Sequence, residues 1–277
     1  MTRVFTWEEV RDGRIPSPED MYVFVRRLRE DLPRIRGVQG AVVCGSVLWK
    51  RANVCSNIDV VVGYTSMTPE LHKELVRLQD IAHGQYITLQ LIPWCIPSAR
   101  TFVDHIDACF ADHVYTASRE GGMIGADIAA NMRTGTIAEL TSCAKQYVCR
   151  KLRKLEEGAI KYSTLTDEGR AKFLEQVLMS PVHVVRKVLQ AYESDVAGVD
   201  VSLYELYCRT SQEVCLSYEL GRGVWDEKDR YIRTLQDQSE YPNRSQYEDV
   251  LSKLHEIAPL AQRMLWHSAS MLKRLPH

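Results

Sequence analysis

The sequence predicts an α/β domain with a mixed sheet, followed by an all-α helical bundle domain. In residues 17–92 the hydrophobic pattern predicts the order helix, strand, strand, helix, strand, which is typical of a small α/β domain. Beyond residue 120 helical periodicity dominates to the end of the chain, and no strong strand signal is found there. A short strand is indicated just before that point, at 112–117. We therefore expect two domains, 1–119 and 120–277.

Caps and prolines define the elements of the first domain. Residues 1–16 show no regular pattern, and Ser17 and Pro18 then predict a helix that Pro33 ends. A Gly-rich turn leads to the first strand, and Pro93 is expected to end the last one. Helices and strands of this domain are expected at 18–32, 41–44, 58–62, 69–81 and 86–92, with a helix or loop at 47–55.

The second domain is predicted from amphipathic periodicity alone. Before it, at the end of the first domain, residues 94–118 carry a helix-like segment that ends before the glycines at 121, 122 and 125. Pro181 is expected to start a new helix after Ser180, and Pro259 is expected to interrupt the last helix. The remaining helices are expected at 138–162, 172–193, 202–220, 226–237 and 244–274.

Composition narrows the classes of function. The 277 residues are 45% hydrophobic and 26% charged, which is ordinary for a globular protein, and the net charge of -1 does not favour nucleic-acid binding. The 8 cysteines form no CxxC pair, so neither a zinc motif nor a redox motif is expected. We see no signal peptide and no transmembrane run, and we expect a cytoplasmic protein without a membrane partner.

The most informative stretch is 45–62, which follows the apolar run 41–44 and includes the Val-rich run 60–62. A Gly45-Ser46 turn follows the first run, and Asn57 and Asp59 come just before the second. Alternate residues of a strand face the same way, so Asn57 and Asp59 are expected to point to one side. Two polar side chains beside a Gly-Ser turn suggest a phosphate or metal site.

This stretch resembles the nucleotidyltransferase signature of the DNA polymerase beta superfamily. Gly45, Ser46, Ser56 and Asp59 match the signature, whereas Asn57 stands where the family places a metal-binding aspartate. A nucleotidyltransferase-like head followed by a helical domain is similar in architecture to the aminoglycoside nucleotidyltransferases. The resemblance implies an α/β (α+β) fold for the head but does not fix the substrate.

The resemblance also implies roles for the residues of the turn. Gly45 and Ser46 would hold the triphosphate of an NTP, with ATP the expected nucleotide, and Ser56 belongs to the same signature. Lys50 or Arg51 could contact the γ-phosphate. These five residues form the predicted nucleotide-binding site.

The predicted catalytic and metal positions are Asp59, Asn57 and Gln90. In the family, carboxylates hold two Mg²⁺ ions that activate an acceptor hydroxyl and neutralise the leaving pyrophosphate. Here Asp59 and Asn57 occupy the metal positions, and Gln90 falls where a third carboxylate is expected. An amide has no negative charge and cannot act as a general base, so only one of three expected acids is present.

Three explanations of the missing acids are open at this point. The protein can be a natural degenerate member that binds a nucleotide without turnover. Asn57 can be an introduced replacement that inactivates the enzyme. The site can instead be completed by a downstream acid, namely Asp104, Asp107 or Asp112.

Two classes of function follow. If active, the protein would transfer a nucleoside monophosphate from an NTP to a hydroxyl of a small molecule or a macromolecule, with Mg²⁺ as cofactor. Alternatively it is a pseudo-nucleotidyltransferase that binds a nucleotide or a partner, for example in a toxin–antitoxin or regulatory complex. Polynucleotide binding is a third candidate.

A basic cluster in the helical domain also has two interpretations. It could form a surface that meets phosphates, or it could be the solvated face of a helix. Its members are Lys145, Arg150, Lys151, Arg153, Lys154 and Lys161, opposed by Glu156 and Glu157.

Overall fold

The computed structural model is a mixed α/β structure made of two compact units. It describes residues 3–96, 108–130, 135–192, 215–238 and 242–275. One unit, Pro16–Gly135, holds the sheet, and the other combines Met1–Ile15 with Thr136–His277. Among the described residues no helix has the length and apolar character that crossing a membrane would require.

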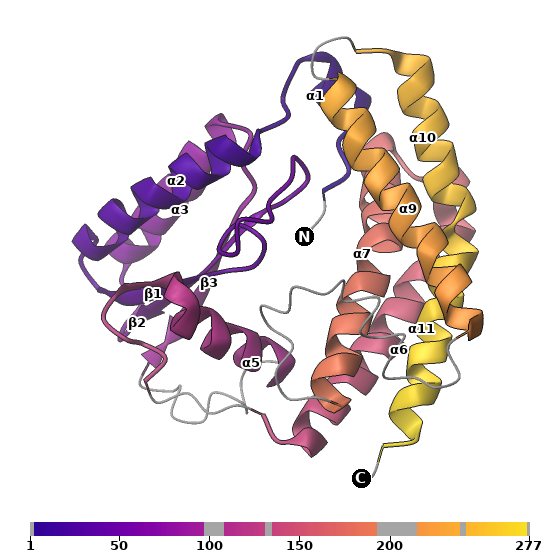
Figure 1. Ribbon diagram of the computed structural model, residues 1–277. Helices are drawn as coiled ribbons and strands as arrows, with labels where there is room; N and C mark the ends of the chain where they lie inside the picture. The colour runs from indigo at the N-terminus through magenta and orange to yellow at the C-terminus, as the bar shows by residue number, and fades with distance from the viewer. Residues whose placement is uncertain (1–2, 97–107, 131–134, 193–214, 239–241, 276–277) are drawn as a thin grey trace. The chain divides into compact units, whose positions relative to one another are not determined.

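The first unit is built on a four-stranded mixed sheet (Figure 1). The strand order is β3-β2-β1-β4, with antiparallel pairing of β1 with β2 and β4 and parallel pairing of β2 with β3. The strands are β1 (Val38–Cys44), β2 (Ile58–Tyr64), β3 (Leu89–Cys95) and β4 (Met123–Gly125). The central pair β1–β2 therefore carries the loop between residues 44 and 58, which holds the Gly-Ser turn.

Helices cover both faces of this sheet. Ser17 caps α2 (Pro18–Asp31), and Thr68 caps α3 (Pro69–Gly84), each by accepting a hydrogen bond from a backbone N–H of the first turn. These two helices pack on one face, and α5 (Ala108–Ala117) packs on the other. Two short turns complete the unit, η1 (Leu32–Arg34) and η3 (Ser118–Gly122).

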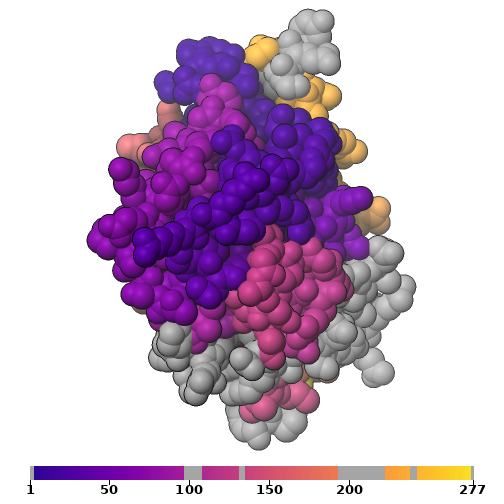
Figure 2. All heavy atoms as spheres, turned by 90° about the vertical axis from the view of Figure 1, so that its left-hand side faces the viewer, coloured from indigo at the N-terminus to yellow at the C-terminus, as the bar shows by residue number. Residues whose placement is uncertain are grey.

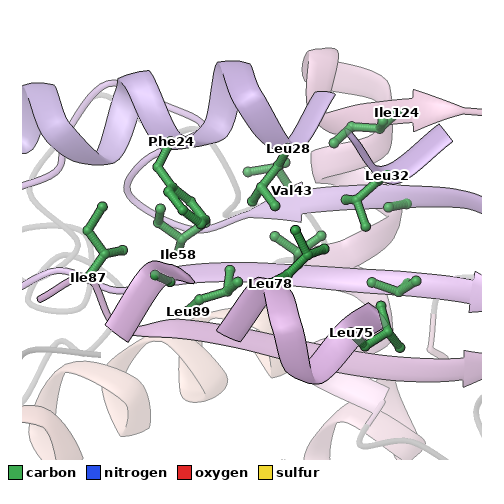
Figure 3. Packing of buried hydrophobic residues seen from close by; sticks show 14 of the residues in the cluster. Phe24, Leu28, Leu32, Val43, Ile58, Leu75, Leu78, Ile87, Leu89 and Ile124 are labelled. Carbon is green, nitrogen blue, oxygen red and sulfur yellow. The ribbon is translucent and has the colours of Figure 1, made fainter. Parts of the chain in front are cut away.

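The core on the α2–α3 face is built from apolar side chains of both helices and of the strands. Phe24 and Leu28 of α2 meet Val43 and Ile58 of the strands, and Leu78 of α3 joins them (Figure 3). Figure 2 looks onto the outer surface of these helices. Each fully buried side chain of this kind contributes about 1.5–3 kcal/mol to folding. The strand residues that point away from this core therefore face α5, and this is the face on which Asp59 lies.

The second unit consists of packed helices. Its long helices α6, α7 and α11 contact one another, and α9 and α10 pack beside them. A capping box at Thr136 and Glu139 starts α6, and Asn243 caps α10. The bounds are α6 (Ile137–Lys161), η4 (Tyr162–Thr164), α7 (Asp167–Tyr192), α9 (Cys215–Gln238), α10 (Arg244–Glu256) and α11 (Ala258–Lys273).

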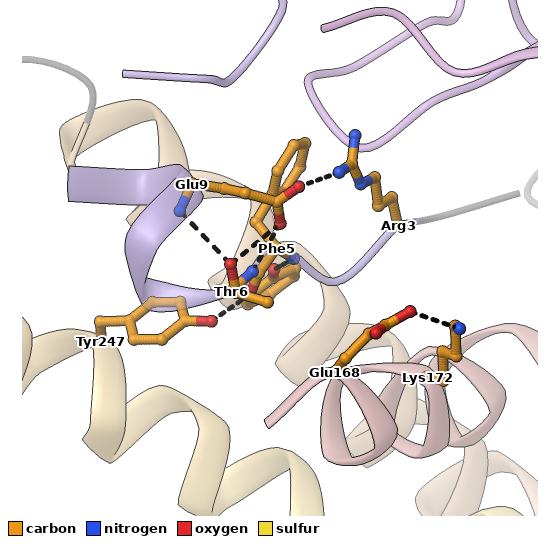
Figure 4. A network of polar contacts seen from close by, with 8 residues as sticks. Arg3, Phe5, Thr6, Glu9, Glu168, Lys172 and Tyr247 are labelled. Atoms are coloured by element: carbon orange, nitrogen blue, oxygen red, sulfur yellow. Dashed lines mark hydrogen bonds and ion pairs between the residues drawn. The ribbon is translucent and has the colours of Figure 1, made fainter. Parts of the chain in front are cut away.

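The N-terminal segment belongs to this helical unit and is fixed there by two tyrosines. The Phe5 N–H donates to the Tyr231 hydroxyl at 2.9 Å, and the Tyr247 hydroxyl donates to the Phe5 carbonyl (Figure 4). Burial raises the pKa of Tyr247, so its hydroxyl stays protonated and acts as the donor of this hydrogen bond. A capping box of Thr6 and Glu9 then starts α1 (Trp7–Arg11), a short helix in a region where none was expected.

Two of the expected helix and strand boundaries at prolines are wrong. Strand β3 continues through Pro93, because β3 is the edge strand and one side of its backbone needs no partner strand. Helix α7 runs unbroken through the buried Pro181 rather than starting there. The break near Pro259 is confirmed, since α10 ends at Glu256 and α11 begins at Ala258.

The expected strand at 112–117 is also wrong, because these residues lie inside α5. The strand that the sequence did not indicate is β4, which pairs with β1 from Gly40 to Val42. Arg29 of α2 supports it by donating to the carbonyl oxygens of Gly121 and Met123 at 2.7 and 3.0 Å. The sheet unit therefore extends beyond the expected end at residue 119 to Gly135, while residues 1–15 join the helices of 136–277. The expected helix at 202–220 lies mostly outside the described residues.

We expect Gly40→Ala to destabilise the sheet unit. A Cβ at this position would lie 2.2 Å from the Ala126 carbonyl oxygen, so β1 and the chain after β4 would have to separate. Such overpacking costs about 1–3 kcal/mol. Denaturant unfolding followed by circular dichroism measures the loss. Gly84→Ala is the matched control, because nothing lies within 4 Å of its Cβ position, and equal stability of the two variants would contradict the packing described.

Candidate functional site

The loop between β1 and β2 begins with a glycine that no other residue replaces without strain. Gly45 has a φ of +79°, in the left-handed region, and a Cβ there would lie 3.3 Å from Asp59 Oδ2. The loop then turns back on itself, with the Leu48 N–H bonded to the Gly45 carbonyl at 3.1 Å and the Arg51 N–H to the Ser46 carbonyl at 2.8 Å. The glycine therefore lets the turn pass directly beside the acid.

Two serines tie the start of this loop to its end. Ser46 Oγ donates to Ser56 Oγ at 3.1 Å, and Ser56 Oγ also accepts the Asn53 N–H at 3.0 Å. Ser56 is buried, so its hydroxyl acts inside the loop. The side chains of Lys50 and Arg51 are exposed, and Lys50 adopts a positive φ of 54°. The structure thus joins Ser46 and Ser56 directly and places the two cations between them along the loop.

The three predicted catalytic side chains come together at the end of the sheet nearest this loop. Asp59 pairs in register with Gln90 on one side and with Cys44 on the other. The Asn57 amide nitrogen lies 2.5 Å from Asp59 Oδ1 and 3.5 Å from Gln90 Oε1. An ionised carboxylate only accepts hydrogen bonds, so the amide group that meets Asp59 is the NH₂. Asn57 therefore bridges the acid and Gln90 as a donor.

The negative charge of Asp59 also affects the pKa of the Cys44 thiol beside it. Burial, and after it the Asp59 carboxylate, raises the pKa of Cys44. The thiol therefore stays protonated and supplies no thiolate ligand. Asp59 is then the one charged group among the four side chains Cys44, Asn57, Asp59 and Gln90.

These donors do not suit a pair of Mg²⁺ ions. Mg²⁺ takes oxygen ligands in octahedral geometry, and carboxylates supply the charge that holds it. Asn57 turns a nitrogen donor toward Asp59 instead of a second carboxylate, and Gln90 is neutral. Among the described residues no group of three or more His, Cys, Asp or Glu side chains is arranged to bind a metal.

One of the three alternative acids can be placed. Asp112 is buried at 3% exposure on α5, the helix that packs on the same face of the sheet as Asp59. Asp104 and Asp107 lie outside the described residues.

Contacts from η3 and α5 hold the loop in a way that the sequence does not reveal. Trp49 Nε1 donates to the Glu120 carboxylate, and the Trp49 ring lies 5.1 Å from the ring of His113. These partners are separated from Trp49 by more than sixty residues, and no local pattern marks them. Their effect is to fix the segment that carries Lys50 and Arg51.

Comparison with models of protein families found none that matches the chain, and comparison with curated proteins found no match either.

We expect Asn57→Leu to destabilise the protein more than Gln90→Met does. Leucine and methionine keep the approximate size of asparagine and glutamine, respectively, but lack the polar atoms of the amide. The first change takes away the donor 2.5 Å from Asp59 Oδ1, and loss of a partner from a charged group costs about 1.5–3 kcal/mol. The second removes only a contact at 3.5 Å from a half-exposed side chain. Denaturant midpoints compare the two, and an equal or reversed order would contradict the bridging role of Asn57.

Proposed function

We propose that this protein is a degenerate relative of the nucleotidyltransferases, with a polymerase beta-like head and a helical domain, which binds an NTP without turning it over. ATP is the expected nucleotide. The observation that carries the proposal is the hydrogen bond from the Asn57 amide to Asp59 at 2.5 Å. It shows a donor satisfying the acid at the position where an active site would need a second acid.

The support for nucleotide binding comes from the loop. Gly45 brings the backbone close to the strand without a side chain, and Ser46 adds a hydroxyl to the same turn. Where right-handed and left-handed residues alternate in a turn, their successive backbone N–H groups point to one side and attract phosphate oxygens. Lys50 and Arg51 are exposed on this loop and supply positive charge for a polyphosphate.

The charge balance favours binding over transfer. A site with three carboxylates repels a triphosphate unless metal ions neutralise it. Here Asn57 and Gln90 are neutral, so of these three positions Asp59 alone carries a charge that opposes the phosphates. Binding without a tightly held metal is therefore electrostatically feasible, whereas activation of an acceptor hydroxyl lacks a second acid.

Nucleotidyl transfer to a hydroxyl acceptor is the second candidate, and one observation favours it. The buried Asp112 on α5 lies on the sheet face that carries Asp59, and a second carboxylate there would restore part of the missing charge. Under this alternative Mg²⁺ would be needed for binding and for turnover.

We expect the wild-type protein to bind ATP with similar affinity with and without Mg²⁺, as measured by isothermal titration calorimetry. Lys50→Gln combined with Arg51→Gln should weaken binding at least tenfold, because one charge-assisted contact is worth about 1.5–3 kcal/mol and about 1.4 kcal/mol corresponds to a factor of ten. The matched control is Lys73→Gln with Arg77→Gln, which removes two exposed cations of α3 in the same unit. Absence of binding by any NTP would exclude both nucleotide functions.

The effect of Asp59→Asn on the same titration separates the two candidates. If the site binds without metal, this change removes a repelling charge, and ATP affinity stays equal or rises. If the site depends on Mg²⁺, the same change abolishes binding, which would support transfer and contradict the degenerate site.

Asn57→Asp should create a site that responds to Mg²⁺. Two carboxylates at the positions now 2.5 Å apart would repel each other, so the variant should be less stable than wild type in the absence of metal. Millimolar Mg²⁺ should raise the melting temperature of the variant and leave that of wild type unchanged. Pyrophosphate release from ATP by the wild type, measured with a coupled assay, would contradict the proposal.

A further inference from the structure

A cavity of about 850 Å³ opens in the helical unit, between α1, the beginning of α7 and α10. Its volume is typical of sites at which proteins bind small molecules. Trp7 of α1, Tyr162 of η4, Asp167 of α7 and His255 of α10 are among the residues that line it. Every lining residue belongs to the helical unit, so the cavity is independent of the loop between β1 and β2.

Two aromatic pairs line this cavity and are held in place by packing. The ring centroids of Trp7 and Tyr247 lie 5.7 Å apart, and the Tyr247 hydroxyl donates to the Phe5 carbonyl (Figure 4). Tyr162 and His255 stack with their centroids 4.1 Å apart and their planes at 19°. Because these contacts already order the rings, an apolar group that binds against them causes little further loss of side-chain freedom.

Each of the three arginines that line the cavity has a carboxylate partner. The pairs are Arg11 with Asp12 at 2.8 Å, Arg170 with Asp167 at 3.8 Å and Arg244 with Glu248 at 2.7 Å. An anion that entered the cavity would have to compete with these carboxylates for the arginines. The cavity therefore does not suit an anionic ligand.

Negative charge remains beside α1. Glu8 lines the cavity, is exposed and forms no ion pair with another of the described residues. The charges that act on Tyr247 are negative as well. Burial is the main cause of its raised pKa, and the carboxylates of Glu9 and Asp167 raise that pKa further. A positive charge is therefore stabilised next to Tyr247, where carboxylates of α1 and α7 both act.

We infer that this cavity binds a small organic cation with one ammonium group and an aromatic body. The ammonium group is held by Glu8 and Asp167, and the body contacts the rings of Trp7 and Tyr162. Among aromatic side chains the indole of Trp gives the strongest cation–π contact, and Trp7 is the neighbour of Glu8. A second ammonium group would meet the arginines of the lining, so a polyamine is disfavoured.

Calorimetric titration of the full chain with phenethylamine at pH 7 and constant ionic strength tests the site. We expect binding, and we expect Glu8→Gln with Asp167→Asn to weaken it about tenfold or more, because both carboxylate partners of the ammonium group are lost. Phenylpropanoate has a similar size but a negative charge, and spermidine has several positive charges and no aromatic body. Both should bind at least about tenfold more weakly than phenethylamine.

The matched control is Asp226→Asn with Glu256→Gln, which removes two exposed carboxylates of the same unit that pair with Arg222 and Lys253 outside the cavity. Trp7→Phe keeps an aromatic face and should retain binding, whereas Trp7→Leu should weaken it. Circular dichroism melts confirm that each variant is folded before it is titrated. The inference is overturned if wild type does not bind phenethylamine, if the control weakens binding equally, or if phenylpropanoate or spermidine binds as tightly.

Discussion

The antiparallel pairing of β1 with β2 is the constraint on which the rest of the sheet unit depends. It sets Cys44 opposite Asp59, so the loop that leaves β1 must return to the strand beside it. Gly45 makes this return feasible, because its backbone is left-handed and it has no Cβ, which would lie 3.3 Å from Asp59 Oδ2. Parallel pairing of β2 with β3 then places Gln90 beside Asp59 on its other side, so that Cys44, Asp59 and Gln90 form one row across the sheet.

The chemistry of Asn57, Asp59 and Gln90 follows from one acid lying between two amides. Where two carboxylates would need metal ions to lie close together, Asn57 and Asp59 attract each other directly. The Asn57 amide stabilises the Asp59 carboxylate by a hydrogen bond, but unlike a metal ion it brings no positive charge and no Lewis acidity. Positive charge is found instead in exposed side chains of the loop and, in the other unit, around the Tyr147 ring between α6 and α7.

Elements marked by local chemistry could be predicted from the sequence. Ser17 with Pro18 and Thr68 with Pro69 start helices where expected, because capping depends on residues within one turn. Elements decided by distant partners could not. The three-residue β4 exists because β1 offers it an edge, and Pro93 remains in a strand because β3 has a neighbour on one side only.

By itself the sequence determined the alternation that puts Asn57 and Asp59 on one side, and it placed Gln90 on the strand that completes the row. These follow from the period of a strand, which is a local property. Only the tertiary structure decided that the Asn57 amide donates to Asp59, that Trp49 is held by Glu120, and that α6 and α7 gather cations on one tyrosine ring. The contacts of Trp49 and of the tyrosine ring depend on packing between elements, and the direction of the Asn57 amide depends also on Gln90, which the register of β2 with β3 brings beside it. Neither register nor packing is encoded in a short stretch of chain.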